Sequence, residues 1–275
     1  MRLSAVILAI MMVCIWPVHA VEKPAPVYEI DASGTIEIGP DGQVVRHELD
    51  KGQPAAIEQA LARNIEQWRF EPIVVDDKPV IAKTRMRLAI EALPTANEDY
   101  QLRIRGVWFG EPGRSAHDMR PPQYPRDAVY AGIGAKVVLV LQLDGQGKVQ
   151  QVHAEQVSLD RLTRSESQAD RWRSMFARTS IETAARWKFD ISETLAGQPI
   201  GTSVRVPVTF SLTEGSRRQG PDNVWHSYVP GPRVPAPWIV GTAVASQDVD
   251  SLKDGDVQAL DSHFKLKNDL IGSVL

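Results

Sequence analysis

A chain of 275 residues has room for two small domains with connecting segments. Its composition is that of a soluble globular protein, with 43% hydrophobic residues and a formal net charge of -3, and this near balance of charge disfavours nucleic acid as a partner. The single cysteine, Cys14, excludes an intramolecular disulfide and a cysteine-based metal site.

The first 20 residues have the features of a secretory signal peptide. Arg2 precedes an apolar run at residues 5–18, and Val18-His19-Ala20 has small residues at the positions that signal peptidase requires. The run is shorter than the ~20 apolar residues that a membrane-spanning helix needs. We therefore expect cleavage after Ala20 and a periplasmic protein. An uncleaved inner-membrane anchor formed by residues 1–20 is the alternative.

Residues 28–92 have the pattern of two strands, a helix and a strand. Two β-prone segments flank the turn sequence Pro40-Asp41-Gly42, and apolar residues at helical spacing follow as far as Trp68. The last segment alternates between inward and basic positions, as a strand with one buried face does. Its inward positions are Val80, Ala82, Thr84, Met86, Leu88 and Ile90.

Residues 93–120 are expected to form a connector that packs on the rest of the protein. A strand-like piece, residues 102–109, carries Trp108 and Phe109, and exposing these side chains to water would be unfavourable. The turn-rich sequence Gly110-Glu111-Pro112-Gly113-Arg114 follows this piece.

Residues 121–213 show the same order of elements a second time. Two apolar and β-branched segments flank the turn Asp144-Gly145-Gln146-Gly147, and a helical pattern ends at Trp187. Residues 203–212 then alternate as a strand with one buried side. The chain from turn to tryptophan is longer here than in residues 28–92, and residues 159–170 are the expected place of an insertion. The fold class is therefore α+β, with two small β-β-α-β modules, each an antiparallel sheet with a helix on one face.

The ordered set of motifs in residues 121–213 resembles the C-terminal domain of the TonB energy-transducer family. The residues that carry the resemblance are Tyr124-Pro125, the pair Gly132 and Gly134, the Asp-Gly type hairpin, Arg186-Trp187-Lys188-Phe189, Gly197-Gln198-Pro199, Val206-Pro207-Val208 and Phe210. Because Trp68-Arg69-Phe70 echoes the tryptophan motif, residues 28–92 are interpreted as a degenerate second copy that arose by internal duplication.

The resemblance implies that the module binds an extended segment, the TonB box of outer-membrane receptors, by strand addition to an open sheet edge. Proline has no N–H, so Pro207 fits only where that position faces outward from the sheet. Residues two apart present their backbone groups to the same side. We therefore expect Arg205, Thr209 and Ser211 on the free edge with Pro207, where the four positions receive the partner strand. The alternative is that Pro207 only protects the edge against aggregation.

Gln123, Tyr124 and Pro125 have two interpretations. In the resemblance, this segment lies beside the docking groove, and its amide and phenol contact the receptor peptide. In the alternative, Tyr124 packs on the end of the sheet and Pro125 starts a short helical turn. Trp68 and Trp187 are expected to be buried.

Catalytic, metal and cofactor sites are not expected. The 6 histidines include no His-x3-His pair of the kind that binds zinc, and Gly132-Ile133-Gly134 lacks the third glycine of a dinucleotide fingerprint. His153 is expected at the surface of a strand rather than as a general base. We therefore expect neither enzyme activity nor a bound cofactor.

The tail, residues 214–275, begins with proline-rich sequence that favours an extended, polyproline-like chain at residues 229–238. One or two short helices are expected within residues 249–275. The resemblance implies a membrane anchor and a long proline-rich spacer for an energy transducer, and we expect this chain to have neither. We expect a periplasmic TonB-like protein that binds TonB-dependent receptors or other envelope proteins and supports transmembrane transport. The alternative is a non-energised envelope scaffold, or a homodimer formed through sheet edges.

Overall fold

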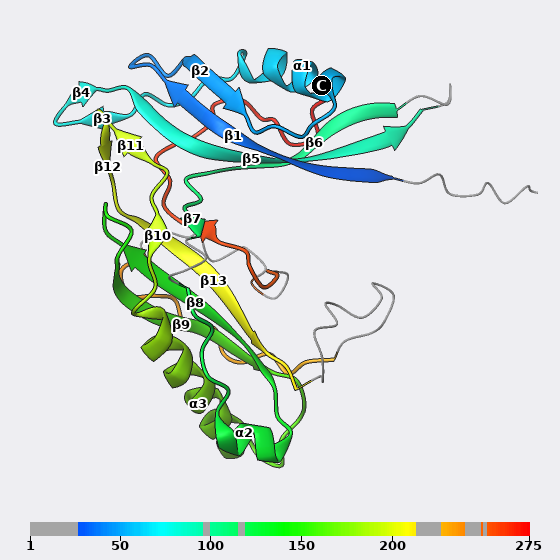
Figure 1. Ribbon diagram of the computed structural model, residues 1–275, viewed down its shortest axis with the longest axis vertical. Helices are drawn as coiled ribbons and strands as arrows, with labels where there is room; N and C mark the ends of the chain where they lie inside the picture. The colour runs from blue at the N-terminus through cyan, green and yellow to red at the C-terminus, as the bar shows by residue number, and fades with distance from the viewer. Residues whose placement is uncertain (1–26, 96–99, 115–118, 213–226, 240–248, 250–251) are drawn as a thin grey trace, which may run out of the picture.

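The computed structural model describes residues 27–95, 100–114, 119–212, 227–239, 249 and 252–275. They form two α+β modules that lie one above the other in Figure 1. The predicted fold class is confirmed, since both sheets are antiparallel and each module carries a helix. The expected signal segment, residues 1–20, lies outside the described residues. None of the helices in the described part of the chain is both long and apolar enough to cross a membrane.

The first module has the predicted order of two strands, a helix and a strand. Its elements are β1 (Tyr28–Ile38), β2 (Val44–Leu49), α1 (Ala55–Ile65), the short β3 (Val74–Val75) and β4 (Lys78–Pro79), and β5 (Ala82–Pro94). The strands lie in the order β2-β1-β5, and β6 (Tyr100–Phe109) pairs with the other side of β5. The connector thus adds a strand to this sheet.

The core of the first module lies between α1 and the sheet. Leu61 and Ile65 of α1 are fully buried, and Trp68 is 1% exposed, as predicted. The alternating pattern expected for the last strand is also present, because Ala82, Thr84, Met86, Leu88 and Ile90 of β5 are all buried.

The second module repeats this order after a short first helix, and its second strand and main helix are longer than those of the first module. Its elements are α2 (Arg126–Ala131), β8 (Ala135–Leu143), β9 (Val149–Leu159), α3 (Glu166–Ala184), the short β10 (Phe189–Asp190), β11 (Thr194–Leu195) and β12 (Gln198–Pro199), and β13 (Thr202–Phe210). The sheet order is β14-β13-β8-β9, where β14 (Gln258–Ala259) comes from the tail. The short β7 (Gly113–Arg114) pairs with β10.

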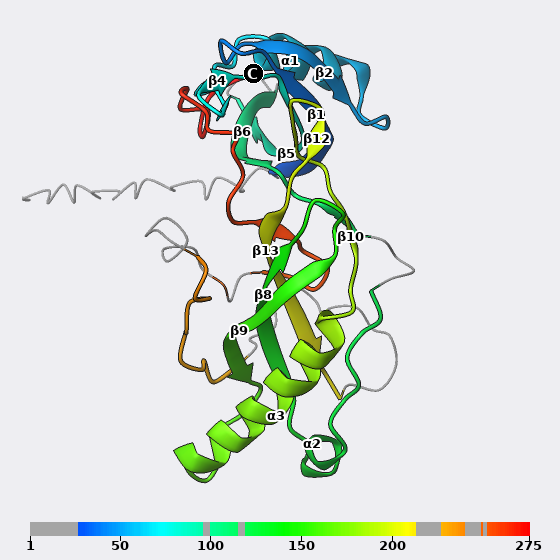
Figure 2. The ribbon, with the colours of Figure 1, turned by 90° about the vertical axis from the view of Figure 1, so that its left-hand side faces the viewer.

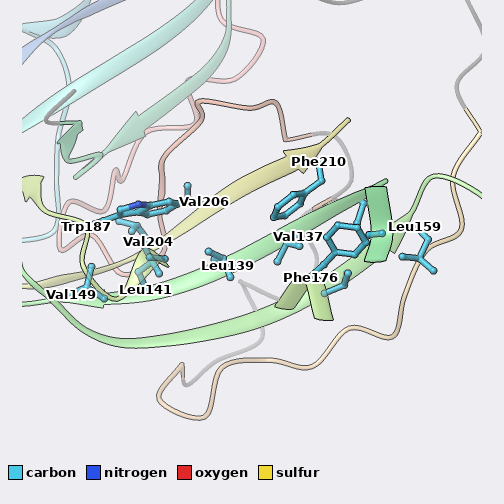
Figure 3. Packing of buried hydrophobic residues seen from close by; sticks show 14 of the residues in the cluster. Val137, Leu139, Leu141, Val149, Leu159, Phe176, Trp187, Val204, Val206 and Phe210 are labelled. Carbon is cyan, nitrogen blue, oxygen red and sulfur yellow. The ribbon is translucent and has the colours of Figure 1, made fainter. Parts of the chain in front are cut away.

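The helix α3 lies across one face of the second sheet (Figure 2). Phe176 of α3 packs against Phe210 of β13 with ring centroids 4.9 Å apart, and alternate residues of β8 and β13 line the core from these rings toward Trp187 (Figure 3). Trp187 is 5% exposed and closes the other end of this core, so its predicted burial is confirmed.

The insertion expected at residues 159–170 is not a separate loop. The strand β9 has 11 residues against 6 in β2, and α3 has 19 against 11 in α1. The extra residues therefore lengthen the strand and the helix. Ser165 fixes the start of α3, because its hydroxyl accepts the backbone N–H of Gln168 at 3.3 Å.

A glycine clasp, in which a turn glycine bonds the phenylalanine after the tryptophan motif, occurs in both modules. The carbonyl of Gly42 accepts the N–H of Phe70, and the carbonyl of Gly147 accepts the N–H of Phe189, both at 2.9 Å. The two glycines have φ of 77° and 75°, in the left-handed region. The shared clasp agrees with an internal duplication, which stays a prediction.

Gly147→Ala is expected to lower the free energy of unfolding by more than about 2 kcal/mol, measured by urea denaturation. A Cβ at this position would lie 1.7 Å from the backbone oxygen of Phe189, so the clasp would have to open. Gly197→Ala is the matched control, because Gly197 has φ 77° but no atom lies within 4 Å of its added Cβ. It should lose only the ~1 kcal/mol of the left-handed backbone. Equal losses in the two variants would contradict the steric argument.

The two modules are joined by a hairpin of the second module. Strand β11 pairs with the start of β5, and the N–H of Ala196 donates to the carbonyl of Ile81 at 2.9 Å. Next to this hairpin the carboxylate of Glu193, 2% exposed, contacts the tail. It accepts the hydroxyl of Ser262 at 2.8 Å and the backbone N–H of His263 at 2.9 Å, and it lies 2.8 Å from His263 Nδ1.

The hydrogen bond to Glu193 raises the pKa of His263 above its ordinary value of 6.5, with the charge of Asp261 adding to this effect and that of Lys265 opposing it. A raised pKa in the folded state means that this stabilisation is fully present below pH 6.5 and is lost as the pH rises through the folded-state value. We expect urea denaturation midpoints to fall as the pH rises above 6.5, and to fall less in His263→Gln. An identical pH profile in the variant would contradict this role.

The tail after β13 is part of the folded structure and runs along the edges of both sheets. Val229 forms two backbone hydrogen bonds with Leu159 of β9, at 3.0 and 2.7 Å, and Val234 donates to Glu155 at 2.8 Å. The segment 229–236 is extended, as predicted, but it is packed rather than free. The expected short helices are wrong, since the described residues from 249 to 275 contain β14 and turns.

This tail also changes the environment of β13. The prediction that residues 203–212 have one buried side is wrong, because Ser203 is 2% and Arg205 is 0% exposed on the side opposite α3. Tail residues reach over that face, and Arg233 contributes an ion pair to it. His153, expected at the surface, is also partly covered, because its Nε2 lies 2.8 Å from the carbonyl oxygen of Val234.

Candidate functional site

The outer edge of β13 is the candidate docking edge. On this side the carbonyl of Ser203 accepts the N–H of Leu260 at 2.8 Å. Since residues two apart in a strand present their backbone groups to the same side, Arg205, Pro207 and Thr209 also face outward. Pro207 therefore lies at a position where the ladder with β8 needs no N–H, as the sequence predicted.

The docking edge is only partly open. Strand β14 pairs with Val204 and Arg205, whereas no strand among the described residues pairs with the outer side of residues 206–210. The expectation that Arg205 offers a free edge is therefore wrong. The sequence of β13 could not reveal this, because the strand that covers Arg205 lies more than fifty residues further along the chain.

The side chain of Arg205 belongs to a buried ion-pair network. Its guanidinium donates to both carboxylate oxygens of Glu155, at 2.6 and 3.0 Å, and to Gln258 Oε1 at 2.9 Å. Arg233 of the tail donates to the same carboxylate at 2.9 Å. This network joins β9, β13 and the tail. The Arg205 side chain is therefore buried in the fold and is not accessible to a partner.

A groove with a volume of about 520 Å³ lies beside the open part of the edge. Its floor is the backbone of β13 at Pro207 and Thr209, and its walls come from three places: the pair Pro121 and Pro122, the indole of Trp187, and the tail at Asp254. A largely apolar groove beside a strand edge suits an extended peptide.

Trp187 has two functions in this groove. Its ring closes the core of the second module, and its indole N–H donates to the carbonyl of Arg120 at 2.8 Å. This bond holds the segment before Pro121 against the end of β13. The position of the proline pair is therefore fixed by a core residue.

Gln123, Tyr124 and Pro125 do not line the groove. The ring of Tyr124 packs against Phe176 and Phe210, its O–H donates to the carbonyl of Ile133 at 2.9 Å, and burial raises the pKa of its phenol. Pro125 is the residue that precedes α2, with φ -62°. Both positions thus agree with the packing interpretation, whereas the exposed side chain of Gln123 is available for contact.

Ser211 lies beyond the end of β13, at a second and smaller hollow. This hollow has a volume of about 270 Å³ and is also lined by Lys136, Thr209 and Tyr228. Of the predicted site residues, the structure therefore brings Pro207 and Thr209 together in the groove, and Thr209 connects it to Ser211 in the second hollow.

In the first module, the edge equivalent to the docking edge is paired with another strand. Pro79 and Pro199 occupy the same place before the last strand of each module, so residues 86–90 of β5 correspond to residues 206–210 of β13. The outer side of β5 is paired with β6 over this stretch, and with β11 before it. The first module therefore has no open edge at the equivalent place.

Comparison with known proteins gives a match to TonB. Two proteins named Protein TonB, from two strains of Xanthomonas campestris pv. campestris, are each 35% identical over 98 residues. The chain is thus similar to TonB proteins over this stretch. The match covers 36% of this chain and 38% of each TonB protein, so the chain spans well under half the length of these relatives. No protein-family model matches the chain, and no solved structure matches it.

The relation to TonB confirms the resemblance recognised in the sequence, whereas a degenerate TonB-like copy at residues 28–92 stays a prediction. Three wall residues of the groove, Pro121, Pro122 and Trp187, were not predicted as site residues. The adjacent prolines were a usable signal, since such a pair favours an extended segment that can lie beside a strand. No cluster of His, Cys, Asp and Glu side chains suited to a metal ion occurs in the described ranges.

Proposed function

We propose that this chain is a periplasmic TonB-like protein that binds an extended segment of outer-membrane transporters, of the TonB-box type, by strand addition to β13, and so supports transmembrane transport. The observation that supports this most directly is the outer edge of residues 206–210, which no strand of the described residues pairs and which lies beside a largely apolar groove. Relation to TonB makes a transporter segment the first candidate for the partner.

The β5–β6 pair supports the geometry of the proposal. It places an antiparallel strand on the corresponding residues of the first module, and the carbonyl of Arg85 there accepts the N–H of Gly110 at 3.2 Å. Arg85 corresponds to Arg205 in the second module. The equivalent residues of β5 and β13 therefore present their backbone groups to the outer side. The pairing of β6 with β5 is the geometry proposed for a partner strand on β13.

The open edge offers few hydrogen-bonding groups. Pro207 contributes only its carbonyl, whereas Thr209 contributes both its N–H and its carbonyl. Because Thr209 faces outward, its N–H is not needed for the ladder with Lys136 of β8. Thr209 is therefore the position at which peptide binding can be changed with the least effect on the fold.

Thr209→Pro is expected to weaken binding of a fluorescent TonB-box peptide at least about fivefold, because it removes one backbone donor from the docking edge. Fluorescence anisotropy gives the affinity, and urea denaturation checks the fold. Thr209→Ala is the matched control, since it keeps the N–H and should bind within about twofold of the parent protein. Equal affinities for the two variants would contradict strand addition.

Peptide N-methylation tests the same proposal without changing the protein. In a strand, alternate N–H groups point to the same side, so methylation at one set of alternate positions removes every N–H that the peptide can donate to β13 and places methyl groups against the edge. Methylation at the other set leaves those N–H groups intact and serves as the control. Strand addition predicts that only one of the two methylated peptides loses binding. Loss of neither, or of both, contradicts it.

A further inference from the structure

We infer that the tail segment 252–261 is a built-in competitor for the docking edge, which a longer partner strand must displace. This inference rests on the proposed function. Strand β14 pairs with Val204 and Arg205 on the outer side of β13, directly before residues 206–210 of the docking edge. Partner and tail therefore share one edge, and the tail limits how far a partner strand can extend toward Ser203.

The contacts that hold this segment are few and close together. The N–H of Leu260 donates to the carbonyl of Ser203, and the carboxylate of Asp261 accepts the N–H of Ser203 and the hydroxyl of Thr202, both at 2.7 Å. Gln258 accepts one N–H of Arg205. All of these groups act on the first four residues of β13.

The turn before β14 is closed by its own hydrogen bonds, and Val257 after it packs against the core of the second module. The N–H of Lys253 donates to the Asp256 carboxylate at 2.7 Å, and the N–H of Asp256 donates to the carbonyl of Lys253 at 2.9 Å. Both side chains are exposed, as is that of Asp254 at the groove. A turn closed on itself can move away from β13 without breaking these bonds.

Both flanks of the segment are fixed to the protein. Val249 is 4% exposed on one side, and Phe264 is 5% exposed on the other, where His263 also bonds Glu193. Displacement is therefore confined to a short loop between two anchors. The local effective concentration of the competing strand stays high after displacement, so binding of a long partner is weakened but not abolished.

A partner strand can replace what the tail provides. The N–H of Ser203 donates to a side-chain carboxylate in the folded chain, and a backbone carbonyl of a partner can accept it instead. Arg205 keeps its two bonds to Glu155 after Gln258 leaves, so its charge remains paired. Displacement therefore exposes no unpaired buried charge.

The test compares TonB-box peptides of two lengths. A five-residue peptide fits the open residues 206–210, whereas a ten-residue peptide also needs residues 203–205. Asp261→Ala should bind the ten-residue peptide about tenfold more tightly, because two charge-assisted hydrogen bonds of the competitor are lost, and should leave the five-residue peptide unchanged. Asp269→Ala is the matched control: it removes the same charge from an exposed tail position that lies beside Leu270 in the first module.

A reversible lock provides a second measurement. Ser203 and Leu260 form a hydrogen-bonded pair, so Val204 and Ala259 form the adjacent non-hydrogen-bonded pair, whose close spacing suits a disulfide. In the variant Val204→Cys with Ala259→Cys, oxidation should reduce the affinity for the ten-residue peptide at least about tenfold, and reduction should restore it.

The outcomes separate the two proposals. The competitor is supported if Asp261→Ala raises the affinity for the ten-residue peptide, the oxidised disulfide lowers it, and the affinity for the five-residue peptide stays the same. If neither change alters the affinity for the ten-residue peptide, the tail is not a competitor, whereas strand addition at β13 still stands. Failure of both peptides to bind the parent protein and every variant overturns the proposed function, and the competitor with it.

Discussion

Glu155→Ala is expected to lower the free energy of unfolding by about 3–5 kcal/mol, the largest effect of a single polar substitution in this protein. The Glu155 carboxylate is 3% exposed and receives hydrogen bonds from Arg205, which is 0% exposed, and from Arg233. Removing it leaves a buried guanidinium without its counter-charge. A buried unpaired charge costs far more than the ion pair itself contributes.

Urea denaturation measures this effect, and Glu182→Ala on the exposed side of α3 is the matched control. The double variant Glu155→Leu with Arg205→Leu removes both charges and should recover much of the loss, because the unpaired charge is gone. A loss in Glu155→Ala no greater than that in Glu182→Ala would show that the network is not buried in solution.

Phe264→Ala is expected to lower the free energy of unfolding by about 3–5 kcal/mol, although the residue lies in the tail. The ring of Phe264 belongs to an aromatic cluster in the first module, 5.8 Å from the centroid of Phe70 and 6.0 Å from that of Phe109. Phe70 and Phe109 in turn pack on Trp68. Truncation leaves a cavity between these rings.

The effect of Phe264→Ala should appear in the first module. The N–H of Glu71 donates to the carbonyl of Lys265 in the tail, and the N–H of Lys267 donates to the carbonyl of Arg69. Hydrogen exchange at these two amides should become faster, and the urea midpoint should fall. Ile271→Ala, whose side chain is 69% exposed on the same tail, is the control and should change neither measurement. If the two variants behave alike, the tail is not part of this core.

The two modules could be predicted from the sequence because their elements have strong local patterns. Alternation along β5 and β13, helical spacing in α1 and α3, and glycine at Gly42 and Gly147 each specify an element without knowledge of distant residues. Lengths were less well predicted. The extra residues of the second module extend β9 and α3, because a longer strand and a longer helix cover each other.

The tail could not be predicted, because its structure comes from contacts with distant residues. Proline-rich sequence at residues 229–238 carries no period, so nothing in it indicates that Val229 and Val234 bond β9. The same limit applies to the site. Pro207 identified the outward side of β13 from local chemistry, whereas the burial of Arg205 depends on Glu155 and Gln258, far away in sequence.

The aromatic cluster around Phe264 has a consequence for biogenesis. On the proposed export route the chain emerges from its N-terminus, so the residues of the first module arrive before those of the tail. Their apolar surface around Phe70 and Phe109 is completed only by the ring of Phe264, which follows the whole second module along the chain. The module that emerges first thus completes its core last.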